Sequence, residues 1–310
     1  MTVLLLYIII KVILKFSISN KCTYSSNVRP VQLKNIIDEK YQNLTRYMDN
    51  NKLKLNSDKT HLMILTSDIN HRNHDNYGIT LNTGNEIILP QESEMLLGGI
   101  VSNDLKWKVH ILNGIKATET SSAKKSLISQ LTTRLNALRK VSTFSSFKVR
   151  KMIGNGIFMS KIVYLIQLWG GCSNFLLKIL QKLQNKAARI ITKSDWNTKI
   201  EILLNQCGWL SIRQLVSYHS LLQVYKTKQN QKPEYFYKKF SKNFPYRTRF
   251  ATGSRIKQDE LVNSELGKSN FTYRAVFEWN ELPTEIRQIP KLGKFKKELK
   301  QWIRIKVPLE

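Results

Sequence analysis

Acidic side chains are scarce in this chain, and their distribution is uneven. The 310 residues include 22 Asp or Glu against 50 Lys or Arg, so the formal net charge is +28 at pH 7. Between Glu119 and Asp195 there is no acid, although this stretch holds 14 Lys or Arg. The basic residues are threaded through periodic segments, which favours a folded protein over a disordered one. Such a balance favours a polyanionic partner, nucleic acid before an anionic membrane surface.

Cysteine is also rare, and the histidines form no complete ligand set. Cys22, Cys172 and Cys207 are widely scattered, so they predict neither a disulfide framework nor a Cys-x-x-Cys metal site. A reducing, intracellular compartment is the corresponding expectation. His71 and His74 form a His-x-x-His pair in a polar loop, but no third ligand lies at a suitable spacing. The sequence therefore predicts no bound metal.

A long uninterrupted hydrophobic run is missing as well. Residues 1–16 are strongly apolar, but Lys11 and Lys15 interrupt them, and they fall short of the ~20 residues of a spanning helix. The start lacks the basic residues of a secretory signal. Three interpretations stay open for residues 1–16: a buried strand or helix, a membrane anchor, or sequence that is not native to the fold.

Two adjacent segments predict helices of different character. Residues 147–169 are apolar around most of a helical circumference and predict a buried helix, which Gly170 and Gly171 would end through positive φ angles. Residues 176–193 predict an amphipathic helix. Its apolar seam is Leu176, Leu180, Leu183, Ala187 and Ile190. Its basic stripe is Lys178, Lys182, Lys186, Arg189 and Lys193.

The basic stripe has no compensating acids on its own helix. Like charges four residues apart repel each other, and on an ordinary helix surface acids relieve that repulsion. A solvated lysine face would explain any one of these residues, but it explains the missing acids poorly. We therefore expect the stripe to contact the phosphate backbone of a nucleic acid.

The remaining segments predict a mixed architecture. A helix should begin at Pro30 and end at Asn50, with its buried side at Leu33, Ile36, Ile37, Tyr41, Leu44, Tyr47 and Met48. Strands are expected at residues 61–65, 77–81 and 86–89, followed by a strand, turn and helix start at 95–111 and helices from 111 to 225. Residues 233–290 interleave aromatic and basic side chains, which suits either base stacking or internal packing. A basic helix at residues 291–306, with a seam of Leu292, Phe295, Leu299 and Trp302, ends the chain.

Four segments then carry a resemblance to a known family. They are NNKLKLNSDKTHLMIL (50–65), LLGGIVSNDLKWKVHI (96–111), the patterns Tyr-x-x-x-x-Trp-Gly and Leu-Gln-x-x-Gln-Asn-x-Ala-Ala-Arg at 164–170 and 180–189, and YRAVFEWNELPTEIR (273–287). In this order and spacing they resemble the C-terminal part of a non-LTR retrotransposon reverse transcriptase of the jockey-like group. The resemblance covers roughly residues 30 to 305.

The resemblance implies an RNA-directed DNA polymerase fold and assigns roles to several residues. Lys59 would match a palm lysine near the incoming nucleotide's phosphates, unless it is a solvated lysine at a strand end. Leu97, Gly98 and Gly99 would match the turn that holds the primer end. The implied divisions are an apolar lead (1–20), a palm remnant (21–111), a helical thumb (112–232) and a basic aromatic-rich region (233–310). The family also implies RNA/DNA duplex as partner and the nucleus as location.

The departure from the family concerns catalysis. Nucleotidyl transfer needs two Mg²⁺ ions held by carboxylates, which the family carries in an Ala-Asp-Asp motif just before the helix expected at Pro30. KCTYSSN (21–27) stands there, and the chain has no Asp-Asp pair. The sequence also lacks a counterpart of the fingers and the first half of the palm. We therefore expect an α+β chain that binds nucleic acid and does not polymerise DNA by itself. A non-enzymatic nucleic-acid-binding protein derived from the thumb and a membrane-anchored protein are the alternatives.

Overall fold

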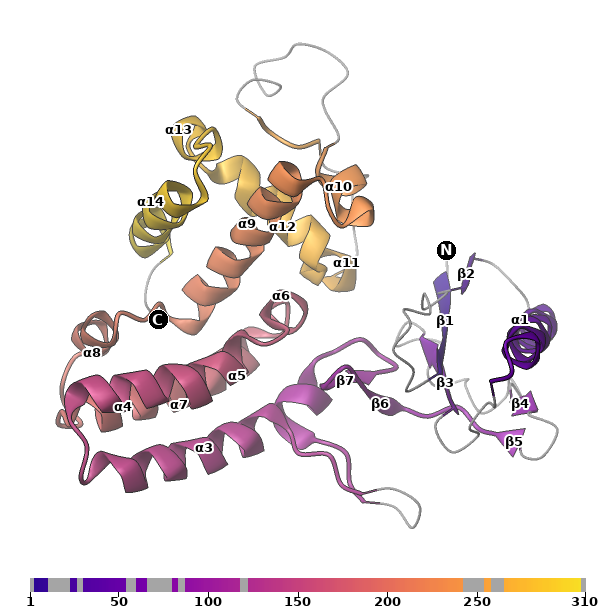
Figure 1. Ribbon diagram of the computed structural model, residues 1–310, viewed down its shortest axis with the longest axis horizontal. Coiled ribbons are helices and arrows are strands. Elements are labelled where there is room, and N and C mark those ends of the chain that lie inside the picture. Colours follow the sequence, from indigo (N-terminus) through magenta and orange to yellow (C-terminus); the bar gives the residue numbers. More distant parts are fainter. Residues whose placement is uncertain are drawn as a thin grey trace. The chain divides into compact units, whose positions relative to one another are not determined.

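The computed structural model describes residues 3–10, 23–26, 30–53, 60–65, 80–82, 87–117, 122–241, 254–257 and 265–307. It confirms an α+β chain in which helices predominate and the strands are short and antiparallel. The chain forms two compact units, Met1–Ser126 and Leu127–Glu310. The boundaries expected at residues 111 and 232 therefore fall inside these units. Figure 1 shows the helices and strands of both units.

The first unit contains a three-stranded antiparallel sheet and a long helix. β1 (Val3–Ile10) lies between β2 (Thr23–Ser26) and β3 (Thr60–Leu65), with Leu5 opposite Tyr24 and Ile8 opposite Leu62. The apolar lead thus forms a strand at Val3–Ile10. Within the described residues, no helix combines the length and apolarity that crossing a bilayer requires.

The helix and first strand predicted after the lead are confirmed, but the predicted burial of Tyr47 is wrong. α1 (Pro30–Asn50) has Ile37, Tyr41 and Met48 buried, whereas Tyr47 is 53% exposed. α1 contacts β4 (Leu81–Asn82). β4 pairs antiparallel with β5 (Ile87–Ile88), where strands were expected at 77–81 and 86–89; residues 77–79 and 83–86 lie outside the described residues.

A second hairpin connects to a short π-helix. β6 (Ser93–Leu96) pairs with β7 (Gly99–Ser102), and η3 (Val109–Asn113) follows. Leu97 and Gly98 form the two-residue turn with φ angles of 48° and 79°, the positive pair that a type I′ turn requires. The buried His110 accepts a hydrogen bond at Nδ1 from the Ile100 amide, 3.2 Å away, which fixes η3 against β7.

The second unit is helical, and its elements pack around two neighbouring cores. α7 lies beside α3 and α4 (Figure 1), and α9 contacts α10, α12 and α14. The elements are α3 (Leu127–Ser142), α4 (Phe147–Ile153), η4 (Gly154–Met159), α5 (Ser160–Val163), α6 (Ile166–Trp169), α7 (Asn174–Thr192), α8 (Ile200–Cys207), α9 (Ile212–Asn230), α10 (Glu234–Phe240), α11 (Glu265–Ser269), α12 (Phe271–Glu281), α13 (Thr284–Arg287) and α14 (Leu292–Lys306).

The prediction of one continuous buried helix at 147–169 is wrong. The segment is α4, the π-helix η4, α5 and α6, with a break where Leu165 takes a φ of 56°. The break lets the buried Trp169 donate from Nε1 to the Tyr164 carbonyl at 3.0 Å. The chain thus gives up helical backbone at Leu165 and gains the hydrogen bond of the Trp169 side chain. The periodicity of the apolar residues does not reveal this interruption.

The predicted reason for the two glycines that follow is also wrong. Gly170 has a φ of −63°, so it does not need left-handed backbone. A Cβ at Gly170 would instead lie 2.6 Å from Cγ1 of Val216 on α9, and one at Gly171 would collide with the Ser269 carbonyl oxygen. Both glycines are needed because other segments approach them closely.

The prediction of helix directly after η3 is wrong. Residues 114–117 and 122–126 are not helical: Gly114 has a φ of 73°, and Ile115 and Lys124 form an isolated antiparallel bridge. A Cβ at Gly114 would collide with the Lys124 carbonyl oxygen, so this reversal depends on glycine. Gly208 ends α8 with a φ of 71°.

The C-terminal core uses aromatic side chains for packing. Phe240, Trp279, Phe295 and Leu299 are at most 1% exposed and share one cluster. Phe236 stacks on Phe240, so for these residues the packing interpretation is the correct one. α14 confirms the basic helix predicted at 291–306, but Leu292 is 38% exposed because the buried seam runs through Phe295, Leu299 and Ile303. The aromatic residues at 244–250, to which the same two interpretations apply, lie outside the described residues.

Candidate nucleic-acid interface

The basic stripe lies on α7, a helix with one covered and one open side. The covered side fits between α3, α4 and α8, which fixes the rotation of the helix. The buried residues are Leu176, Leu177, Leu180, Gln184, Ala187, Ala188 and Ile191. Leu183 and Ile190, which we expected in the seam, are only half-buried. The buried arc is therefore rotated slightly from the predicted one, and a glutamine lies at its centre.

The five stripe residues differ in their surroundings. Lys178, Lys182 and Lys186 are exposed. Lys193 is exposed too, in left-handed conformation at the end of α7 with a φ of 54°. Arg189 is half-buried and donates from Nη2 to the Trp196 carbonyl at 2.9 Å. Within the described part of the chain, none of the five forms an ion pair, so the like-charge repulsion along α7 is unrelieved.

Three amide side chains join α7 to the start of α9. Gln184, fully buried, donates from Nε2 to the Leu210 carbonyl at 2.8 Å. Gln181 donates from Nε2 to Oε1 of Gln184 at 2.9 Å and to Oδ1 of Asn185 at 2.7 Å. Oε1 of Gln181 accepts from the Ile212 amide at 2.8 Å. We call Gln181, Gln184 and Asn185 the amide network. It fixes where α9 begins relative to the stripe.

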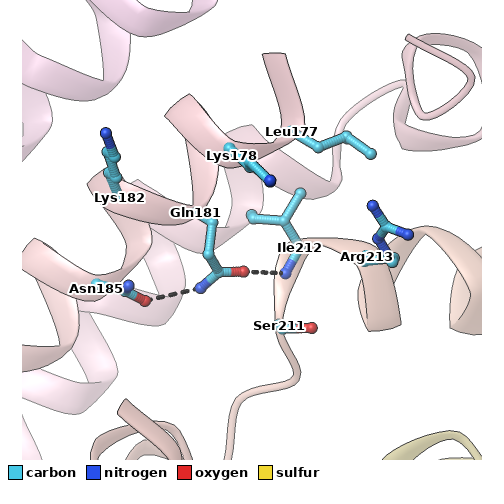
Figure 2. Close-up of a pocket in the computed structure, with 8 residues that line it drawn as sticks. All are labelled: Leu177, Lys178, Gln181, Lys182, Asn185, Ser211, Ile212 and Arg213. Carbon is cyan, nitrogen blue, oxygen red and sulfur yellow. Dashed lines mark hydrogen bonds between the residues drawn. The ribbon is translucent and has the colours of Figure 1, made fainter. Parts of the chain in front are cut away.

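A pocket of about 330 Å³ opens where the stripe meets the start of α9 (Figure 2). α7 contributes Lys178 and Lys182, and α9 contributes Arg213. The remaining lining residues are Leu177, Gln181, Asn185, Ser211 and Ile212. None of the described residues that line the pocket is an acid, so its three cationic side chains produce a positive potential. The N-terminal end of the α9 dipole adds to it.

Local hydrogen bonds hold the α9 side of this pocket in place. Ser211 and Gln214 form a capping box, in which Oγ of Ser211 accepts from the Gln214 amide and Oε1 of Gln214 accepts from the Ser211 amide. Nη2 of Arg213 donates to Oδ1 of Asn174 at 3.0 Å, which ties the guanidinium to the first residue of α7. The pocket is thus built on the side of α7 and the fixed start of α9, and a helix start is a favourable place for an anion.

The residues assigned by resemblance belong to the first unit. Lys59 lies outside the described residues. Leu97, Gly98 and Gly99 form the tip of the β6–β7 hairpin, where the Leu97 side chain is 74% exposed. A leucine with positive φ is strained, and an exposed one gains nothing from burial. The turn therefore breaks a local rule, a feature that often accompanies function.

The donor set at the expected metal position does not fit Mg²⁺. β2 and its neighbours, KCTYSSN at 21–27, offer hydroxyl, amide, thiol and ammonium groups but no carboxylate. Two divalent ions close together need charged oxygen ligands. Within the part of the chain that the structure describes, no three His, Cys, Asp or Glu residues come together as a metal site.

The reactive groups elsewhere in the second unit are held neutral. Burial raises the pKa of the Cys207 thiol to about 11, although Lys151 opposes the shift. Burial also lowers the pKa of His219 to about 4, helped by Lys226. A protonated thiol is a poor nucleophile. Neither Cys207 nor His219 is among the residues that line the pocket.

Sequence reasoning missed Arg213, Trp196 and the amide network. A weak signal existed for the network, since Gln181, Gln184 and Asn185 stand at i, i+3 and i+4, where side chains meet on a helix. No periodic signal marked Arg213 or Trp196, because contacts between distant segments place them.

Compared with known proteins, the chain matches no protein-family model, no curated protein and no solved structure.

Proposed function

We propose that this protein binds the phosphate backbone of a nucleic acid through α7 and the start of α9. The observation that carries the proposal is the set of exposed lysines Lys178, Lys182 and Lys186 on one helix, which form no ion pair with any described residue. Two of them share a pocket with Arg213. Phosphate contacts require charge at suitable positions and make few demands on side-chain shape.

The spacing of the three lysines suits a polyanion. Lys178 and Lys186 are eight residues apart, which corresponds to about 12 Å along an α-helix. One strand of B-DNA carries a phosphate about every 3.4 Å of axis, so this span covers roughly three or four phosphates. A single small anion would satisfy the pocket but would leave Lys186 uncompensated. A polymer compensates all three lysines and Arg213.

The proposed origin of this surface is a reverse transcriptase of the non-LTR, jockey-like group. In that proposal the second unit has the role of a thumb that grips RNA/DNA duplex, and the strands of the first unit descend from a palm. The sequence motifs, the basic composition and the α+β order of elements support it. The absence of an Asp-Asp pair from the sequence restricts the proposal to binding, without DNA synthesis by this chain alone.

The salt dependence of binding tests the proposed function. Affinity for a labelled blunt duplex is measured over a series of salt concentrations for the wild type and for Lys178→Ala/Lys182→Ala/Lys186→Ala. Each phosphate contact contributes about 0.9 to the slope of log K against log salt. We expect the triple variant to lose about 2 to 3 from that slope, with weaker binding at low salt.

A matched triple variant on α14 provides the control. Lys294, Lys296 and Lys297 are exposed and belong to the same unit, so their replacement by alanine removes the same charge from another surface. The control should keep most of the wild-type slope. Equal losses in the two variants would show that net charge, and not the α7 surface, drives binding. Wild-type binding that ignores salt would overturn the proposed function altogether.

A further inference from the structure

One aromatic side chain at the end of the basic stripe stands in solvent. Trp196 is 85% exposed, whereas the other five tryptophans are buried or half-buried. It lies in the segment between α7 and α8, three residues after Lys193, the last residue of the stripe. Exposing an indole in water forfeits the large gain that burying it would bring, so a packing role does not explain this position.

The segment that carries Trp196 is held in place by the stripe itself. Nη2 of Arg189 donates to the Trp196 carbonyl at 2.9 Å, and the Thr198 amide donates to the Asp195 carbonyl at 3.3 Å. The main chain at Trp196 is therefore fixed, while its ring remains free to meet a partner. Arg189 acts here as a positioning residue, which also explains why it is less exposed than the lysines.

The charges around Trp196 favour an anionic partner. Arg189, Lys193 and Lys199 are close to it in sequence, and Asp195 is the neighbouring acid, so the local balance is positive. A flat exposed ring beside a row of cations is the combination by which proteins bind unpaired nucleotides, since the cations hold phosphates and the ring stacks on a base.

We propose that Trp196 stacks on an unpaired base of a nucleic acid whose backbone follows the stripe. This inference rests on the proposed function and adds a preference: the surface should bind a single strand, or a duplex with a single-stranded end, more tightly than a blunt duplex. Stacking is sequence-tolerant because every base offers an aromatic face. The preference would therefore concern strandedness and not base identity.

The test compares the wild type with Trp196→Ala and Trp196→Phe, using a labelled short oligothymidylate and a blunt duplex of equal length. Trp196→Ala should weaken oligothymidylate binding by about 5- to 150-fold, the range expected for one stacked base. The salt slope should stay unchanged because no charge is removed. Trp196→Phe should retain most of the affinity, and blunt-duplex binding should be unaffected in both variants.

Intrinsic fluorescence gives a second readout. Saturating oligothymidylate should quench the emission of the wild type, and Trp196→Phe should lose that quenching while it still binds. Wild-type affinity for oligothymidylate in Trp196→Ala would overturn the stacking proposal, and so would an equal loss for the blunt duplex. If the α7 triple variant still shows its reduced salt slope, those results overturn the stacking proposal alone. An unchanged slope in the triple variant points to failure of the proposed function.

Discussion

Replacement of Gln184 by leucine should lower the stability of the fold and leave nucleic-acid binding unchanged, because Gln184 lies on the buried side of α7 and the lysines lie on its open side. Gln184 is fully buried and donates to the Leu210 carbonyl at 2.8 Å, while its own carbonyl oxygen accepts from Gln181 at 2.9 Å. Leucine has a similar size but can make neither hydrogen bond. The Leu210 carbonyl would then lose a donor in a region that water does not reach, since Leu210 is 3% exposed.

The magnitude follows from these contacts. An unsatisfied buried acceptor costs about 1–3 kcal/mol, and the extra apolar surface that leucine buries offsets part of this cost. Gln181 retains its hydrogen bond to Asn185 at 2.7 Å, so the amide network does not collapse completely. We expect Gln184→Leu to lower the free energy of unfolding by about 1–3 kcal/mol.

Urea unfolding followed by tryptophan fluorescence measures this change. Trp209 is buried and stacks on Phe158 in the same core, so it reports on the region. A double-mutant cycle with Gln181→Leu should give a coupling energy of about 0.5–3 kcal/mol, as for side chains in direct contact. The salt slope of duplex binding should not change, because the substitution is neutral. Unchanged stability would refute the structural role of the network, and a reduced slope would place Gln184 in the binding surface.

Two further predictions concern a buried carboxyl and the strained hairpin turn. Burial raises the pKa of Glu278 from 4.5 to about 7, with Arg274 and the Ser217 hydroxyl opposing the shift, so the folded state binds its proton more tightly than the unfolded state. The stability that the protonated carboxyl contributes is complete below pH 4.5 and is lost as the pH rises through 7. At pH 8, Glu278→Gln should therefore have a free energy of unfolding about 1–3 kcal/mol above that of the wild type, with little difference at pH 4. Parallel pH profiles of thermal unfolding for the two proteins would contradict this. At the β6–β7 turn, Leu97→Asn should stabilise the first unit by about 1 kcal/mol in urea unfolding, because asparagine tolerates the φ of 48° better than leucine. Gly98→Ala at the neighbouring φ of 79° should do the opposite, and a stability loss in Leu97→Asn would show that the leucine side chain is used.

Sequence periodicity located the elements that bury one continuous apolar face. α1, β3, α7 and α14 lie within a few residues of their predicted bounds because their apolar residues recur at the helical or strand period. The interruption of residues 147–169 was not predictable in this way. It depends on Leu165 taking a φ of 56° so that Trp169 reaches the Tyr164 carbonyl, a tertiary choice that leaves the apolar pattern intact.

The candidate site divides in the same manner. The row of lysines on α7 follows from the sequence alone, since spacing and the absence of acids are both visible there. Arg213 joins that row only because the amide network places the start of α9 against α7. The sequence does not distinguish Trp196 from the tryptophans of the core. Trp196 becomes a candidate only because the fold leaves its side chain exposed. Exposure and long-range contact are properties of the folded chain.

The residues that carry the family resemblance on α7 differ from those that carry the proposed binding. In the pattern Leu-Gln-x-x-Gln-Asn-x-Ala-Ala-Arg, the specified residues include the amide network, the fully buried Ala187 and Ala188, and Arg189, which holds the Trp196 segment. Lys182 and Lys186 occupy unspecified positions of that pattern. The pattern therefore describes how α7 packs, and a chain could keep it with any charge on the open side. Binding by the lysines and descent from a reverse transcriptase are thus separable proposals: an unchanged salt slope in the α7 triple variant would remove the first and leave the second untouched.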